Sequence, residues 1–227
     1  MDPITIGILY LSAKTLHSWL RETSHKSVES TPSPPSYLPP KKIITLVGAT
    51  GAGKSSTINA LVGRKACIAG IDHGTTQAIN EVNYINGYLL RDTPGLMDEV
   101  DYTEKVWSAV TDSQIVIYTT SGQAYRKERD IIKKIHDSQQ QLNQAINAID
   151  KRHLVLYVNK QDITELSLPR TVRDREKLAI HEQVSNWIPK DKVIFGASMP
   201  VMKGRRRSPQ IEDLNSLIHS LIQNKTH

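Results

Sequence analysis

The sequence is poor in features that would assign it to several common protein classes. Its 227 residues include one cysteine, Cys67, which excludes an intramolecular disulfide and fits a reducing compartment. No stretch reaches the roughly 20 consecutive apolar residues that a membrane-spanning helix needs. The apolar start, residues 4–13, lacks the leading positive charges and the cleavage pattern of a secretory signal. We therefore expect a cytoplasmic protein.

Acidic residues are also outnumbered, and the formal net charge is +6. A basic surface leaves two interpretations open: contact with ribosomal RNA or an anionic membrane, or a contribution to solubility alone. The same alternatives apply to the basic segment 203–207, Lys-Gly-Arg-Arg-Arg.

Composition divides the chain into three zones. Residues 1–22 form an apolar to amphipathic segment, and residues 23–40 form a linker rich in serine and proline. The first zone, which contains Lys14 and Trp19, could lie on the inner face of a membrane, dock onto a partner or onto the rest of the chain, or form a tail. Residues 41–227 alternate short apolar runs with helix-compatible stretches and form the third zone.

This alternation predicts an α/β domain with helices on both faces of a mainly parallel sheet. Strands are expected over residues 43–47, 81–85, 88–91, 115–119, 154–158 and 193–195. Helices are expected over residues 54–63, 102–111, 125–150, 173–187 and 210–223. Asn86-Gly87 predicts a hairpin turn, because both residues accept a positive φ, and the sheet should therefore carry one antiparallel edge strand.

Residues 48–55 match a phosphate-binding pattern, Gly-x-x-x-x-Gly-Lys-Ser, between a predicted strand and a predicted helix. Backbone N–H groups of such a loop bind phosphate oxygens, the lysine adds a positive charge, and the serine hydroxyl can ligate Mg²⁺. The residues expected around the phosphates are Thr50, Gly51, Ala52, Gly53, Lys54, Ser55 and Ser56.

Two further segments suit the metal and the terminal phosphate. Asp92 ends a predicted strand, where its carboxylate could hold a Mg²⁺-bound water, and Gly95 could present its N–H to the γ-phosphate. A threonine of the pair Thr75-Thr76 could complete the coordination of the metal. We expect Lys54, Thr76 and Gly95 to act in catalysis, and Ser55, Thr76 and, through water, Asp92 to hold Mg²⁺.

The base is expected to lie against Asn159-Lys160-Gln161-Asp162, which follows a predicted strand. The carboxylate of Asp162 can accept hydrogen bonds from N1–H and the 2-amino group of guanine, which adenine lacks. Asn159 would tie this loop to the phosphate loop, and Lys160 would lie along the base. Ala197 and Ser198 follow the last strand, and the Ala197 N–H could donate to guanine O6.

In their order along the chain, these segments resemble the Era-like, translation-factor-related class of P-loop GTPases. The phosphate loop is also similar to those of septins and immunity-related GTPases. The resemblance covers residues 41–224 and implies a Ras-like G domain: three layers, a six-stranded mostly parallel sheet, and GTP or GDP with Mg²⁺ in the site. The interval from Lys54 favours Thr76 over Thr75 as the switch threonine.

The sequence departs from this resemblance at positions that matter for hydrolysis. Leu96 stands where Ras-type enzymes place a glutamine that orients water. Gly51 stands where potassium-activated Era-like enzymes place an asparagine, and Thr50 adds bulk beside it. We expect slow intrinsic hydrolysis by a molecular switch, completed by a homodimer or another partner. The alternative is a scaffold that binds GTP without hydrolysing it, with the effector left open.

Overall fold

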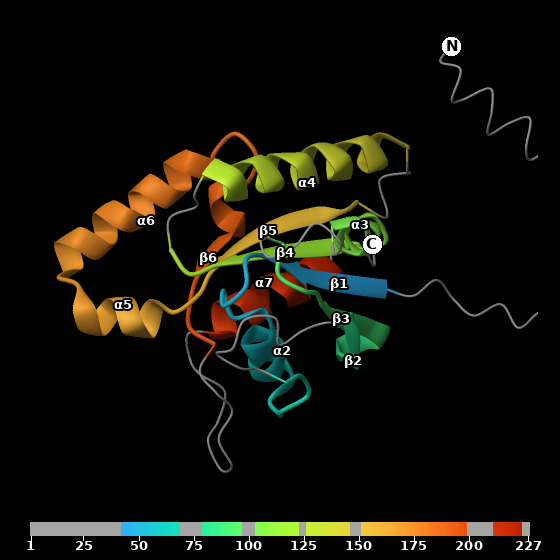
Figure 1. Ribbon diagram of the computed structural model, residues 1–227, viewed down its shortest axis with the longest axis horizontal. Helices are drawn as coiled ribbons and strands as arrows, with labels where there is room; N and C mark the ends of the chain where they lie inside the picture. Colours follow the sequence, from blue (N-terminus) through green and yellow to red (C-terminus); the bar gives the residue numbers. More distant parts are fainter. Residues whose placement is uncertain are drawn as a thin grey trace, which may run out of the picture. The chain divides into compact units, whose positions relative to one another are not determined.

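Six strands form one sheet, and their order places the first strand near the middle. The computed structural model describes residues 42–68, 79–96, 103–122, 126–145, 151–198 and 211–223. The strand order is β2-β3-β1-β4-β5-β6 (Figure 1). The strands are β1 (Lys42–Val47), β2 (Asn80–Asn83), β3 (Tyr88–Asp92), β4 (Ile115–Thr120), β5 (His153–Val158) and β6 (Val193–Phe195). All neighbours pair in parallel except β2 and β3, so β2 is the expected antiparallel edge strand.

Helices cover both faces of this sheet, which gives the predicted three layers. They are α2 (Lys54–Val62), α3 (Thr103–Thr111), α4 (Arg126–Ala145), α5 (Gln161–Ser167), α6 (Arg170–Val184) and α7 (Glu212–Gln223). One apolar cluster joins the sheet to α2 and α7, and a second joins the opposite face to α3, α4 and α6. Because the central strands are covered on both faces, they are almost continuously apolar.

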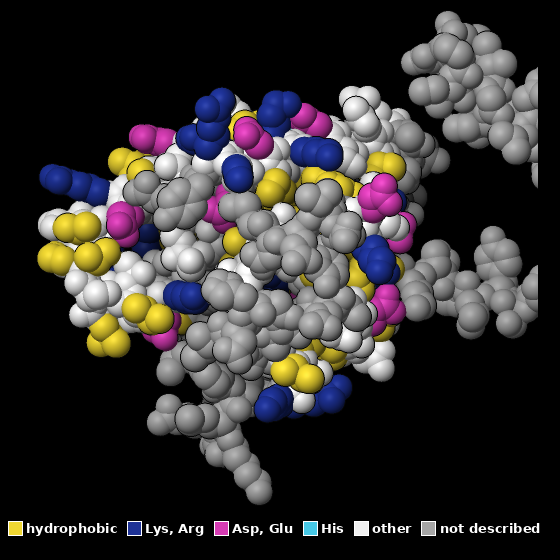
Figure 2. All heavy atoms as spheres, viewed as in Figure 1, with side chains coloured by type: hydrophobic (Ala, Val, Ile, Leu, Met, Phe, Trp, Pro, Cys, Tyr) yellow, Lys and Arg dark blue, Asp and Glu magenta, His cyan; other side chains and the backbone are white. Residues whose placement is uncertain are grey.

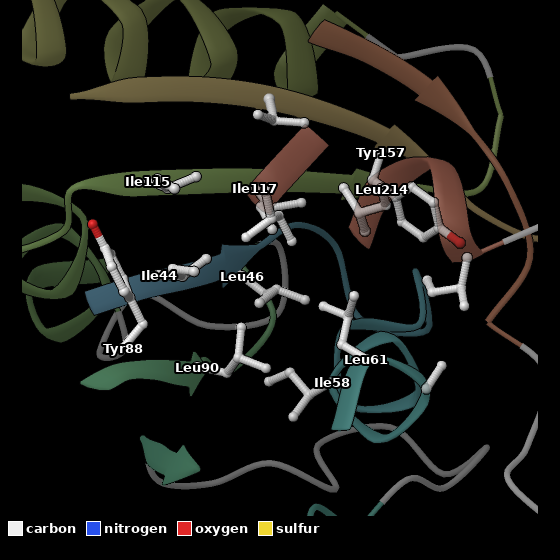
Figure 3. Packing of buried hydrophobic residues seen from close by; sticks show 14 of the residues in the cluster. Ile44, Leu46, Ile58, Leu61, Tyr88, Leu90, Ile115, Ile117, Tyr157 and Leu214 are labelled. Carbon is white, nitrogen blue, oxygen red and sulfur yellow. The ribbon is translucent and has the colours of Figure 1, made fainter. Parts of the chain in front are cut away.

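Figure 3 shows how the first cluster seats the helix that follows the phosphate loop. Leu61 of α2 points toward Leu46 of β1, and Ile58 of α2 lies beside Leu90 of β3; all four side chains are fully buried. Burying each such side chain contributes roughly 1.5–3 kcal/mol. The second half of α2 is therefore fixed against the sheet, which holds the helix that follows the phosphate loop in place.

The hairpin between β2 and β3 has the predicted turn, but the strand before the turn ends earlier than predicted. Asn86 has φ 52° and Gly87 has φ 76°, and the N–H of Tyr88 donates to the carbonyl of Ile85. The N–H of Tyr84 also donates to the carbonyl of Tyr88, at 2.8 Å. Two residues of one strand therefore face one residue of the other, and β2 ends at Asn83 rather than at residue 85.

The helix predicted over residues 173–187 is wrong in its bounds. Two helices, α5 and α6, occupy this region and meet at Leu168-Pro169. Leu168 is extended, with φ −124° and ψ 141°, because the residue before a proline disfavours the helical conformation. The first of the two helices begins inside the segment 159–162, which periodicity alone did not reveal.

Among the described residues, no helix is long and apolar enough to cross a membrane.

Candidate functional site

The carboxyl ends of the parallel strands bring the predicted motifs to one edge of the sheet. Leu46 of β1 pairs with Asp92 of β3, so the phosphate loop begins beside this carboxylate. Farther along the same edge, Val158 of β5 pairs with Phe195 of β6, which brings the segments 159–162 and 196–198 together. This edge is where open α/β sheets bind their ligands.

Two glycines let the phosphate loop approach its neighbours more closely than any other residue could. Gly48 has φ 149°, and a Cβ built on it would collide with the carbonyl oxygen of Thr119 in β4. Gly53 has φ 96°, and a Cβ there would collide with Nδ2 of Asn159. The loop is thus wedged between two strand ends, and a side chain at either glycine would displace it.

Lys54 turns its charged end back over the phosphate loop. Its Nζ donates to the carbonyl oxygens of Gly48 at 3.1 Å and Ala49 at 3.0 Å, and the residue is buried. A buried ammonium group is costly unless hydrogen-bonded, and these carbonyls provide that compensation. The positive charge is therefore held inside the loop that the sequence predicts to surround the phosphates.

Ser55 and Asp92 meet beside this charge. The Ser55 hydroxyl donates to Oδ2 of Asp92 at 2.6 Å, and Asp92 is fully buried. The following residue, Thr93, donates its hydroxyl to the carbonyl of Leu46 at 2.7 Å, which fixes the start of this loop to β1. The hydrogen bond between Ser55 and Asp92 joins α2 to β3 and places two side-chain oxygen groups side by side.

Asn159 connects the remaining loops. Its Nδ2 donates to the carbonyl of Ala52 at 3.0 Å, and its Oδ1 accepts from the N–H of Ser198 at 2.8 Å. The N–H of Gln161 donates to the carbonyl of Gly196 at 3.0 Å, which ties the same two loops a second time. Phosphate loop, base motif and final loop are therefore one hydrogen-bonded unit.

The backbone also turns sharply at the base motif. Lys160 has φ 62°, a left-handed conformation that is uncommon for a residue with a side chain. The turn ends β5 and starts α5 immediately, so that Asp162 lies in the first turn of this helix. Ala197 is fully buried where the final loop begins.

Comparison with known proteins decides the family. The model of the family described as 50S ribosome-binding GTPase matches residues 43–188, which is more than half of the chain. The chain belongs to this GTPase family. It is a GTP-binding, P-loop GTPase domain, and members of the family generally use Mg²⁺.

Curated relatives agree with this assignment. The chain is 31% identical over 129 residues to the tRNA modification GTPase MnmE of Porphyromonas gingivalis, covering 52% of this chain and 25% of the relative. It is 26% identical over 184 residues to MnmE of Syntrophobacter fumaroxidans, covering 78% of this chain and 33% of the relative. GTPase Der of Desulforudis audaxviator is 27% identical over 153 residues, which cover 63% of this chain and 32% of Der. The chain therefore spans a quarter to a third of these relatives.

Solved structures show the same fold. The structure of Era in complex with MgGDPNP and a segment of 16S ribosomal RNA matches with a TM-score of 0.52 and 16% identity, covering 80% of this chain and 56% of Era. A probable GTP-binding protein, EngB, matches with a TM-score of 0.51 and 19% identity, covering 80% of this chain and 99% of EngB. The expectation of an Era-like GTPase fold is confirmed.

The residues of this GTPase domain fit a magnesium ion. Mg²⁺ prefers hard oxygen ligands, and the hydroxyl of Ser55 and the carboxylate of Asp92 are such ligands, held 2.6 Å apart. The third predicted ligand, Thr76, lies outside the described residues, as do Thr75, the segment 203–207 and the zones 1–22 and 23–40.

The residues at which the sequence departs from the family pattern lie in or beside the phosphate loop. The N–H of Leu96 donates to the carbonyl of Gly48 at 3.2 Å, and its half-buried side chain packs against the cluster under α3. Gly51 is exposed at the tip of the phosphate loop, with φ 75° and open space where a Cβ would lie. Thr50, Gly95 and Ser56 are half-buried around the same loop.

Sequence reasoning missed two residues that the structure places at the junction of these loops. The hydroxyls of Thr57 in α2 and Tyr157 in β5 both lie within hydrogen-bond distance of Ser198 Oγ. Neither residue belongs to a recognised motif. Thr57 is three positions after Lys54 on a helix, so a polar side chain at a core-facing position was the one signal that could have found it.

Proposed function

We propose that the chain binds GTP and GDP with Mg²⁺ and hydrolyses GTP slowly, as a molecular switch. The observation that supports this most is the position of Asn159. One side chain joins the phosphate loop at Ala52 to the final loop at Ser198. A site built this way presents phosphate-binding and base-binding groups to one ligand.

In this proposal, Asp162 selects guanine. Its carboxylate accepts from N1–H and the 2-amino group, while the Ala197 N–H donates to O6 and Lys160 lies along the base. Adenine offers no donor to the carboxylate and would leave it unsatisfied, which costs several powers of ten in affinity. The left-handed turn at Lys160 and the bond from Gln161 to Gly196 support a fixed position for the carboxylate.

At the other end of the ligand, Lys54 exchanges its bonds to the loop carbonyls for the β- and γ-phosphates. Backbone N–H groups of residues 50–56 bind the phosphate oxygens. Ser55, Asp92 and Thr76 would hold Mg²⁺, which neutralises charge on the triphosphate when it is bound. Thr76 and Gly95 would hold the attacking water, and loops 64–80 and 95–103 would relax after hydrolysis.

Slow hydrolysis follows from what the site lacks. Leu96 has no polar atom with which to orient a water, and its side chain is engaged with the apolar cluster under α3. Gly51 has no side chain to ligate a potassium ion. The chain's own catalytic groups would then be Lys54, Thr76 and Gly95, without a polar side chain at position 96 to orient the water.

Single-turnover hydrolysis tests the proposal. The full chain with GTP and Mg²⁺ should turn over slowly in sodium and show little gain in potassium. Gly51→Asn is the matched variant, because its site is open and asparagine tolerates a positive φ. A large potassium enhancement in the natural sequence would contradict this account of the loop.

A scaffold that binds GTP without hydrolysing it is the second candidate, and Leu96 favours it. The two candidates differ in how the rate responds to protein concentration. A rate that rises with concentration would indicate hydrolysis completed by a homodimer, while no turnover at any concentration would indicate the scaffold.

Our proposal for the partners and the location of the chain rests on its positively charged side chains. Lys and Arg side chains gather along α4 (Figure 2), and the exposed ones in its first half are Arg126, Lys127, Lys133 and Lys134. Because the Era structure contains 16S ribosomal RNA, we propose ribosomal RNA as one partner. An anionic membrane, reached from the cytoplasm through residues 1–22, is the alternative. Liposome flotation with and without residues 1–40 separates the two.

A further inference from the structure

Three hydroxyl groups from three different elements meet between the phosphate loop and the final loop. Oγ1 of Thr57 lies 2.7 Å from Oγ of Ser198, which lies 3.2 Å from the phenol oxygen of Tyr157. The Thr57 hydroxyl also donates to the carbonyl of Gly53 at 2.8 Å. A continuous chain therefore runs from β5 through the final loop to the backbone of the phosphate loop.

Ser198 is the middle of this chain and contacts both other hydroxyls. The Ser198 hydroxyl donates to the phenol oxygen of Tyr157, and the Thr57 hydroxyl donates to the carbonyl of Gly53, which can only accept. Between Thr57 and Ser198 either hydroxyl can be the donor. Removing the Ser198 hydroxyl therefore breaks the chain at both of its contacts.

Burial makes these bonds costly to lose. Thr57 and Tyr157 are both 0% exposed, so water cannot replace a missing partner. Burial also raises the pKa of Tyr157 to about 12; the bond to Ser198 opposes this shift and the charge of Asp162 adds to it. The phenol therefore keeps its proton at physiological pH, and its oxygen accepts from Ser198.

We propose that Thr57 and Tyr157 are positioning residues that couple guanine recognition to phosphate binding through Ser198. This inference rests on the proposed function, because it assigns these residues a part in holding the same nucleotide. Thr57 holds the carbonyl next to Lys54, and Ser198 follows the Ala197 N–H expected at guanine O6. The hydroxyl chain runs alongside the bonds of Asn159 as a second link between the two loops.

Pre-organisation gives this link its effect on the ligand. Loops already joined in the free protein need less ordering when the nucleotide binds. Without the link, the nucleotide itself must hold the final loop against α2, and it dissociates sooner. Losing one buried hydrogen bond typically changes an equilibrium by roughly three- to tenfold.

The test measures release of a fluorescent GDP analogue from the full chain. Thr57→Val keeps the shape of the side chain and removes its hydroxyl, and Ser198→Ala removes the middle of the chain. Each should speed release roughly three- to tenfold. The double variant should release nucleotide more slowly than the product of the two single effects predicts, because both changes remove the same bond.

Two conservative variants separate positioning from mere packing. Thr57→Ser keeps the hydroxyl in a smaller side chain. It should release nucleotide within about twofold of the natural rate, which is the effect expected of a near-neutral change. Tyr157→Phe removes only the group that accepts from Ser198 and should have a smaller effect than Ser198→Ala. Ser198 is half-buried in a loop, so Ser198→Ala remains informative if the variant at Thr57 does not fold.

Natural release rates in Ser198→Ala, or single effects that simply multiply in the double variant, would overturn the coupling. Thr57→Ser releasing as fast as Thr57→Val would overturn it as well, because packing would then explain both. If the natural chain fails to bind the GDP analogue, the proposed function itself is wrong, and that outcome is distinct from all of these.

Discussion

At the scale of single residues, Gly53 packs tightly against Asn159. The glycine has a positive φ, and the amide of Asn159 occupies the space a Cβ would need. The same amide group donates to Ala52, so moving it also breaks the link between the base loop and the phosphate loop. One backbone position thus controls both halves of the proposed nucleotide site.

Gly53→Ala should therefore abolish measurable GDP binding. The variant adds a steric collision to the roughly 1–2 kcal/mol that a side chain costs in a left-handed conformation. Gly51→Ala is the matched control, because Gly51 also has a positive φ but open space around its Cα. Calorimetric titration with GDP should show binding in the control alone. Equal binding by both variants would mean that the contact with Asn159 does not matter.

Asp162→Asn should change which base is bound. An amide in place of the carboxylate can donate to the 2-oxo group of xanthine, and it no longer matches the two donors of guanine. Competition between GTP and XTP should shift toward XTP by several powers of ten. Unchanged affinity for GTP would remove Asp162 from the base site.

At the scale of elements, α2 is held at both ends by polar contacts. Near its end, Asn59 receives the N–H groups of Ala66 and Cys67 on Oδ1, each at 2.7 Å, and donates to the carbonyl of Cys67 at 2.9 Å. The asparagine is 7% exposed. It folds the following loop back onto the helix that carries Lys54 and Ser55.

Asn59→Ala should lower the free energy of unfolding by about 2 kcal/mol or more, because it leaves buried backbone groups without partners. For a domain of this size we expect the melting temperature to fall by roughly 4–8 °C. Gln141→Ala is the control: it removes an amide from an exposed position of α4 and should change stability by less than about 0.5 kcal/mol. Equal melting temperatures for the two variants would contradict this role of Asn59.

Elements differ in how far the sequence predicts them. The central strands are evident because they are buried on both faces, and Asn86-Gly87 identifies the hairpin because few residues accept a positive φ. The break between α5 and α6 lies at Pro169, and the predicted helix over residues 173–187 covers only the part of the chain after this proline. The turn at Lys160 has no glycine to announce it, since the tertiary structure imposes that conformation.

At the scale of the whole molecule, the motifs could be predicted and most of their contacts could not. In a mainly parallel sheet the loops after the strands lie at one edge, which predicts that residues 48–56, 92–95, 159–162 and 197–198 gather there. The contacts of Asn159 and the hydroxyl chain from Tyr157 join residues up to 141 positions apart, so no local pattern reports them. Packing between distant loops is a property of the fold.

The same scale holds the central claim, that the assembled edge binds guanine nucleotides. Calorimetric titration of the full chain with GTP and with ATP, both in Mg²⁺, tests it most directly. The account predicts tight binding of GTP and an affinity for ATP weaker by roughly 10⁴-fold, the discrimination expected when the carboxylate of Asp162 loses both of its donors. Binding of ATP as tightly as GTP, or no binding of GTP, would contradict it.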